Sequence, residues 1–141
     1  MSITGIVMPD AVIEAFEQVK LDDTLRGIMI AILNEELVVD RLIKEEFDVF
    51  VNSVIQDEVP RFIIYDFLVP NKSGILNKKL VLISWIPMAS PVVERMKYAG
   101  TKTMIRRSFP GVALDIHLEE REELTKESLK ARFVKDHRIN L

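Results

Sequence analysis

The 141-residue sequence contains no cysteine, only two histidines and five glycines. Without cysteine the chain can form neither disulfides nor thiolate metal sites, which fits a reducing compartment. His117 and His137 lie near no recognisable serine, aspartate or metal-ligand pattern. A glycine-rich phosphate loop is also missing. These absences predict a protein that is not an enzyme and that holds neither a metal nor a cofactor.

Long apolar runs and an excess of positive charge are missing as well. No apolar run reaches the roughly 20 residues that a helix needs to cross a bilayer. The opening Met-Ser-Ile-Thr lacks the basic region of a secretory signal. The formal net charge is −3, whereas nucleic-acid binding usually requires a net basic surface. We therefore expect a soluble cytoplasmic protein without a membrane span and without specific nucleic-acid binding.

The residues that are abundant indicate one packed domain. Hydrophobic residues make up 48% of the chain and include seven phenylalanines, which favours a globular core over a disordered chain. A length of 141 residues is typical of a single domain with one sizeable core. We therefore assign residues 1–141 to one domain.

Apolar spacing and turn residues predict an alternation of strands and helices. Val12, Phe16 and Val19 follow helical spacing after Pro9. Thr125 is placed to cap the last helix, because its hydroxyl can accept from the free amides of the first turn. We expect strands at 27–33, 37–39, 61–68, 80–86 and 112–118, and helices opening at Pro9 and spanning 44–55, 92–107 and 126–134. These elements predict an α+β fold, with a central mixed β-sheet of about five strands and helices on both faces.

The stretch from residue 80 to 107 is the centre of this prediction. Leu80–Ile86 is an almost unbroken apolar run and indicates a strand buried on both faces. Pro91 suits the first turn of the helix that follows. At about 100° per residue, two groups of side chains separate around that helix. The basic group is Arg95, Lys102 and Arg106; the other group is Val92, Met96 and Thr103. We expect the second group to be buried and the basic group to form an exposed edge.

This stretch and three others resemble the actin-depolymerising factor/cofilin family. The motifs, in chain order, are Thr4-Gly5-Ile6, Phe16-Glu17-Gln18-Val19-Lys20-Leu21, Arg61-Phe62-Ile63-Ile64-Tyr65-Asp66-Phe67, and Trp85-Ile86-Pro87 followed by Arg95-Met96-Lys97-Tyr98-Ala99-Gly100-Thr101-Lys102. The resemblance runs from about residue 3 to residue 135. It implies the fold of the actin-depolymerising-factor homology domain, and a protein that acts as a monomer in the cytoplasm and on the cytoskeleton.

The resemblance implies binding to actin monomers and to filament sides, with severing and depolymerisation of filaments. In the family, the long helix enters a cleft in actin and its basic residues contact the acidic partner. The monomer-binding positions matched in this chain are Thr4, Gly5, Ile6, Arg95, Met96, Tyr98 and Lys102, to which we add Glu120 and Glu123. Tyr98 is expected to be mostly buried, with a partner for its hydroxyl. Thr4 takes the place of the serine whose phosphorylation switches binding off, because the phosphate would repel acidic actin.

A second surface binds filaments in the family, through a hairpin and the last helix. Here the hairpin contributes Lys78 and Lys79, and the last helix contributes Arg132 and Lys135. The acidic run 119–123 by itself is typical of a solvated segment rather than a metal site, since it lacks the spaced carboxylates and glycine turn of a calcium loop.

One departure from the family pattern keeps alternatives open. Val93 stands where the family usually has a basic residue, and Lys97 lies about 200° around the helix from Arg95, so it cannot replace the missing charge. A family member that binds monomers but severs weakly is therefore an alternative. A further alternative is an adaptor whose basic surface binds phosphoinositides, although the net acidic chain argues against this as the main activity.

Overall fold

The computed structural model describes residues 5–135, with side chains up to residue 133. Five strands form one sheet in the order β2-β1-β3-β4-β5. The strands are β1 (Gly27–Leu33), β2 (Glu36–Ile43), β3 (Arg61–Pro70), β4 (Leu76–Trp85) and β5 (Val112–Leu118). Neighbours pair antiparallel except β4 and β5, which pair parallel. The predicted mixed sheet of five strands is confirmed.

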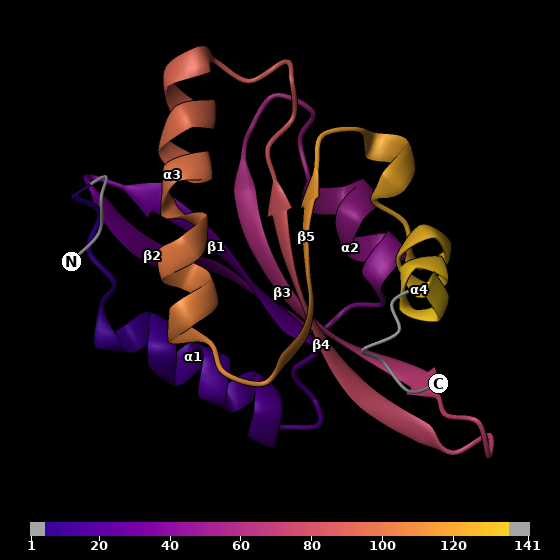
Figure 1. Ribbon diagram of the computed structural model, residues 1–141. Coiled ribbons are helices and arrows are strands. Elements are labelled where there is room, and N and C mark those ends of the chain that lie inside the picture. Colours follow the sequence, from indigo (N-terminus) through magenta and orange to yellow (C-terminus); the bar gives the residue numbers. More distant parts are fainter. Residues whose placement is uncertain (1–4, 136–141) are drawn as a thin grey trace.

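Helices cover both faces of the sheet, as predicted (Figure 1). They are α1 (Asp10–Leu21), α2 (Phe47–Val54), α3 (Val92–Ser108) and α4 (Lys126–Lys135), with a short 3-10 turn at Arg121–Glu123. Apolar residues of α1 and α3 pack with one set of strand residues, and those of α2 and α4 pack with the alternate set. This division follows from the period of two along each strand, which sends successive side chains to opposite faces.

The central strand is buried on both faces, as its sequence predicts. On β4, Val81 and Ile83 face α2 and α4, while Leu80 and Leu82 face α1 and α3. Every residue from Leu80 to Trp85 is buried. The strand begins earlier than expected, at Leu76, because the β3–β4 pairing continues outward to Pro70 opposite Leu76. The resulting long hairpin projects beyond the helices (Figure 1).

Two other boundaries differ from the sequence prediction. β2 runs on to Ile43, so helix α2 begins at Phe47 instead of residue 44. The residues between them, 44–46, are neither helix nor strand, and the Glu45 carbonyl accepts a hydrogen bond from the Tyr65 hydroxyl at 2.9 Å. At the other end of the chain the predicted cap is confirmed, since the Thr125 hydroxyl oxygen accepts from the Ser128 amide at 3.1 Å.

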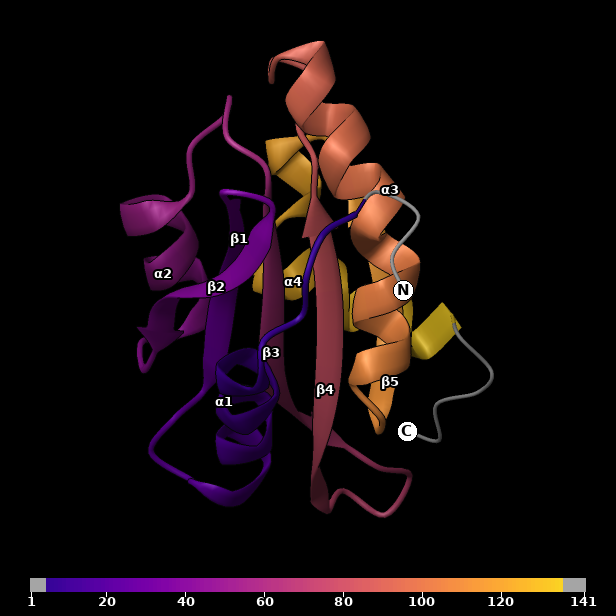
Figure 2. The same cartoon turned by 90° about the vertical axis from the view of Figure 1, so that its left-hand side faces the viewer.

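The N-terminal segment 5–9 is fastened to the sheet before α1 begins. The Val7 amide donates to the Glu35 carbonyl, and the Val7 carbonyl accepts from the Leu37 amide, both at 3.0 Å. These bonds form a short parallel bridge beside β2. Figure 2 shows the segment running from the start of α1 toward α3 across the same face of the sheet. The segment therefore lies on the side of the molecule that carries the long helix.

Candidate functional site

Helix α3 connects the parallel strands β4 and β5 and buries a different side from the one we expected. Tyr98, Thr101 and Ile105 are the residues that face the sheet. Val92 and Met96 are exposed by 59% and 68%, so the prediction that they are buried is wrong. The buried positions recur at intervals of three and four, which is the inward face of a helix. The exposed side of α3 is thus partly apolar.

Exposed apolar residues lie on the first turns of α3 and in the loop that precedes it. Met88, Val92, Val93 and Met96, which we call the apolar stripe, are all more than half exposed. Large apolar side chains gathered on one surface are unusual in a monomer and indicate a contact site for another protein. A hollow of about 250 Å³ opens beside the stripe. Its lining residues are Ile86, Val92, Arg95, Met96, Ala99, His117 and Glu119.

The basic edge of α3 borders this hollow and is oriented by its neighbours. The Arg95 Nε donates to the Ser90 carbonyl at 3.2 Å. The Lys102 Nζ lies 3.0 Å from the Nδ1 of His117. Burial, and then the positive charge of Lys102, lower the pKa of His117, so at neutral pH the ring is uncharged and Nδ1 can accept from the ammonium. Lys102 and Arg95 are therefore held in place, and neither forms an ion pair with an acidic side chain among residues 5–133.

Tyr98 holds α3 against the sheet at a point where strand pairing stops. The β1–β3 pairing ends at Ile30 opposite Phe62, which leaves the Ile32 amide without a strand partner on that side. The Tyr98 hydroxyl accepts from this amide at 2.9 Å. Tyr98 is 1% exposed, which confirms the expectation that it is buried with a bonded hydroxyl. Tyr98 therefore lies beneath the predicted monomer-binding surface and supports it by holding α3 against the sheet.

The N-terminal part of the predicted monomer surface is divided in the same way. Gly5 is exposed and has a φ of +79°, a left-handed conformation that favours glycine. Ile6 is 3% exposed and packs in the core between α1, α3 and the sheet. Thr4 lies outside the described residues. The structure thus places Gly5 at the surface and Ile6 beneath it.

The acidic residues Glu120 and Glu123 connect the two predicted surfaces. Glu120 is exposed in front of the 3-10 turn. Glu123, in the monomer set, forms an ion pair of 2.8 Å with Arg132 of α4, in the filament set. The two sets therefore adjoin each other at this pair. Lys135 lies in α4, but its side chain is outside the described part.

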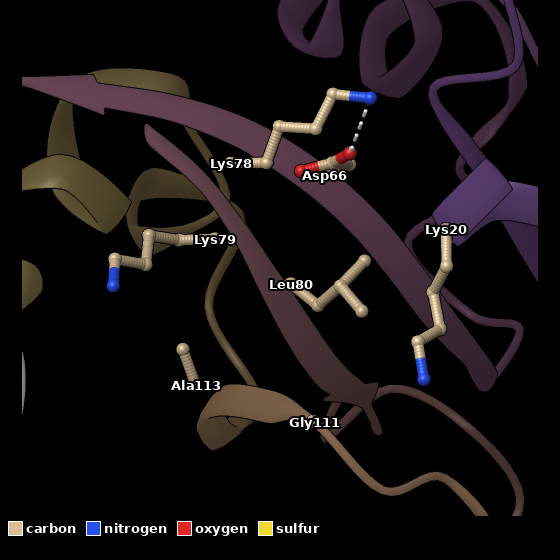
Figure 3. A pocket seen from close by; sticks show the side chains of 7 residues that line it. All are labelled: Lys20, Asp66, Lys78, Lys79, Leu80, Gly111 and Ala113. Atoms are coloured by element: carbon tan, nitrogen blue, oxygen red, sulfur yellow. Dashed lines mark ion pairs between the residues drawn. The ribbon is translucent and has the colours of Figure 1, made fainter. Parts of the chain in front are cut away.

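Lys78 and Lys79 point to opposite faces of the β3–β4 hairpin (Figure 3). Lys79 alternates with Val81 and so lies on the face covered by α2 and α4. Lys78 lies on the other face, where it contacts Asp23 and forms an ion pair with Asp66 at 3.8 Å. Of the two hairpin lysines, Lys79 alone shares a face with Arg132.

Asp66 is the buried member of this charged group. It is 6% exposed, and its Oδ1 has no hydrogen-bond partner among the described residues. Burial raises the pKa of Asp66, against the opposing effect of Lys78 and Arg26. A hollow of about 220 Å³ opens where β4 extends beyond β5 (Figure 3). Its lining residues are Lys20, Asp66, Lys78, Lys79, Leu80, Gly111 and Ala113.

The described part of the chain offers no further class of site. No cluster of three or more histidine or acidic side chains in it has the arrangement of a metal site. None of its helices combines the length and the apolar character of a transmembrane segment.

Sequence reasoning missed two contributors to the α3 surface. Met88 follows the central strand in the loop between Pro87 and Pro91 and was not among the predicted residues, although methionine is common at protein-binding surfaces. Glu35, in the turn between β1 and β2, forms an ion pair of 3.2 Å with Lys97 of α3. No local pattern indicates this pair, because its members are far apart in the chain.

Comparison with known proteins gives one consistent result. The family model described as cofilin/tropomyosin-type actin-binding protein matches residues 5–133. Cofilin from Schizosaccharomyces pombe is 30% identical over 132 residues, which cover 92% of this chain and 95% of the relative.

Two solved structures support the same assignment of the fold. The crystal structure of Streptomyces griseoflavus cofilin superposes with a TM-score of 0.85 at 26% identity, covering 94% of this chain and all of that chain. Human coactosin-like protein has the same fold, with a TM-score of 0.83 at 20% identity and coverage of 93% and 99%. The chain therefore belongs to the actin-depolymerising factor/cofilin family of actin-binding proteins, which are not enzymes.

Proposed function

We propose that this chain binds actin monomers and the sides of actin filaments in the cytoplasm, and that it promotes filament severing and depolymerisation. The observation that carries the proposal is the apolar stripe beside Arg95 and Lys102. These basic residues are oriented by uncharged partners, Ser90 and His117. An apolar contact with a charged rim is the usual composition of a specific protein interface. It suits a partner with an apolar cleft and acidic margins.

The filament activity rests on a second surface that adjoins the first. Lys79 and Arg132 lie on the α4 side of the sheet, and Arg132 pairs with Glu123, which belongs to the predicted monomer-binding set. A chain bound through α3 to one actin subunit can then contact the neighbouring subunit through the hairpin and α4. A protein that binds one conformation of the filament more tightly than another shifts the filament toward that conformation. We expect a filament held in this conformation to break more readily.

The monomer site is tested by removing its two charges together. Replacing Arg95 and Lys102 by alanine should weaken binding to fluorescently labelled actin monomers by about tenfold, because complementary charges at an interface are worth more than at a free surface. The unfolding temperature should hardly change. A matched control replaces Arg41 and Lys44 by alanine near the β2 edge, at the opposite end of the sheet from β5. Equal affinities for the two double variants and the unmodified chain would contradict the proposed site.

A monomer-binding protein with weak severing is the second candidate. Val93 is 69% exposed on α3, so the charge expected at this position is absent from the surface. Lys78 is engaged by Asp23 and Asp66, which reduces the charge available to a filament. Counting breaks in surface-attached filaments by fluorescence microscopy separates the candidates. Normal monomer affinity with few breaks supports the second candidate, and Val93→Lys should then raise monomer affinity.

A further inference from the structure

The turn between β1 and β2 has a backbone conformation that is energetically unfavourable for one of its two residues. Asn34 and Glu35 both have positive φ, 52° and 61°, which is the two-residue turn typical of tight hairpins. Asparagine tolerates this conformation well, but the second position usually holds glycine. Glu35 is thus a non-glycine residue kept in a left-handed backbone. Residues in such unfavourable backbone conformations cluster at functional sites.

The contacts of Glu35 indicate the role of this residue. Its carboxylate oxygen Oε1 lies 3.2 Å from the Nζ of Lys97 on α3. Its carbonyl accepts from the amide of Val7 in the N-terminal segment. One residue therefore bonds through its side chain to the long helix and through its backbone to the segment that carries Gly5. Glycine at this position would keep the turn and lose the bond to α3.

Lys97 is placed where it controls the orientation of α3. It lies between Met96, which is exposed, and Tyr98, which is buried. Tyr98 bonds to Ile32, close to the same turn, so two consecutive helix residues are fastened to the end of one hairpin. Lys97 is about 200° around the helix from Arg95. A bond at Lys97 thus resists rotation of α3 from the side opposite Arg95, where Lys97 adjoins Val93, four residues earlier in the helix.

We propose that Glu35 is a positioning residue for actin binding, which fixes α3 and the N-terminal segment relative to each other through Lys97 and Val7. This inference rests on the proposed function, since it assigns both elements to one actin-binding surface. A surface made of two separately mobile parts must lose that mobility when it binds, at a cost in affinity. The Glu35 turn removes part of this cost in advance. The carboxylate need not contact actin to have this effect.

The test compares five variants with the unmodified chain in binding to labelled actin monomers. Glu35→Gln and Lys97→Gln should each weaken binding about threefold, in line with a partly exposed ion pair. The variant with both changes should bind actin monomers no less tightly than the single variant with the lower affinity, because both changes remove the same bond. The exchanged pair, Glu35→Lys with Lys97→Glu, should recover most of the affinity. Glu36→Gln removes the same charge from the next residue and should bind normally.

A sixth variant separates positioning from simple stability. Glu35→Gly relieves the left-handed strain, so its unfolding temperature should equal or exceed that of the unmodified chain, while its affinity should fall as in Glu35→Gln. Additive losses in the double variant, no recovery in the exchanged pair, or unchanged affinity in Glu35→Gly would each overturn the proposal. Direct contact of either side chain with actin would show itself as failure of the exchanged pair.

Amide hydrogen exchange tests the coupling without actin. Lys97→Gln should speed exchange at the Val7 and Leu37 amides several-fold, because the turn that holds Val7 loses its bond to α3. Unchanged exchange at both amides would overturn the coupling. If the unmodified chain bound no actin, the proposed function would fall, whereas this comparison would still decide whether Glu35 links the two elements.

Discussion

Replacing Tyr98 by phenylalanine should both destabilise the fold and weaken actin binding, for one structural reason. The change removes one hydroxyl and keeps the ring, which is 1% exposed and lies 5.2 Å from the Phe62 ring between centroids. The Ile32 amide then loses its acceptor in a partly buried site. An unsatisfied buried amide costs about 1–3 kcal/mol, less where water can reach it. We expect a loss of about 1–2 kcal/mol in the free energy of unfolding.

The assay uses the single tryptophan of the chain. Trp85 is buried in β4, so its fluorescence reports unfolding in urea, and thermal unfolding can be followed in parallel. For a domain of this size, about 1–2 kcal/mol corresponds to a fall of roughly 3–8 °C in Tm. Monomer affinity should fall about twofold to fivefold, because α3 is held less firmly.

Tyr65→Phe is the matched control on the other face of the sheet. Tyr65 is equally buried, its hydroxyl donates to the Glu45 carbonyl at 2.9 Å, and it packs with α2. Loss of the Tyr65 hydroxyl should lower Tm by a similar amount and leave the affinity for actin monomers unchanged. An unaltered Tm in Tyr98→Phe would refute the role of the hydroxyl. Equal losses of affinity in both variants would show that general instability, not the position of α3, governs binding.

Three further predictions concern the other surfaces and the buried carboxylate. Replacing Lys79 and Arg132 by alanine should reduce co-sedimentation with filaments and spare monomer binding; a parallel loss of both would contradict the two-surface interpretation. Asp66→Asn should raise Tm at pH 7. Burial lifts the folded pKa of Asp66 above its ordinary value of 3.8, so the folded state is favoured below that pH, and this contribution is lost as pH rises through the folded pKa. The gain in Tm should therefore shrink as the pH falls toward 3.8, and a constant gain would refute this cause. Thr4→Glu should weaken monomer and filament binding at low salt, where repulsion from an acidic partner is least screened; binding equal to that of the unmodified chain would remove the N-terminus from the contact.

The architecture was predictable because core residues repeat with the period of their elements. The apolar run of β4 and the helical spacing of apolar residues in α1 indicate buried elements from the local sequence alone. Boundaries were less predictable, because they depend on partners elsewhere. β4 begins at Leu76 only because Pro70 lies opposite it, and nothing in the local sequence marks that pairing.

The α3 surface shows why apolar spacing can predict the wrong buried face of a helix. Apolar residues are normally buried, and this rule assigned Val92 and Met96 to the core. The structure instead buries Thr101 and exposes both apolar side chains. A binding surface breaks the usual distribution because its apolar side chains are buried by a partner. The resemblance proposed Arg95, Met96 and Lys102 as contact residues from motif alone, whereas the Glu35–Lys97 pair could be recognised only from the fold.

The parallel pairing of β4 with β5 has a consequence for the order of folding. The β1–β2 and β3–β4 hairpins join neighbouring segments, but β5 reaches β4 only after the whole of α3 has crossed the sheet. Loop-closure entropy makes such distant pairings slow relative to hairpins. The basic helix edge therefore acquires its partners on β5, His117 among them, at a late step. We expect a newly made chain to complete the α3 surface that we propose for actin binding only after the β1–β2 and β3–β4 hairpins have formed.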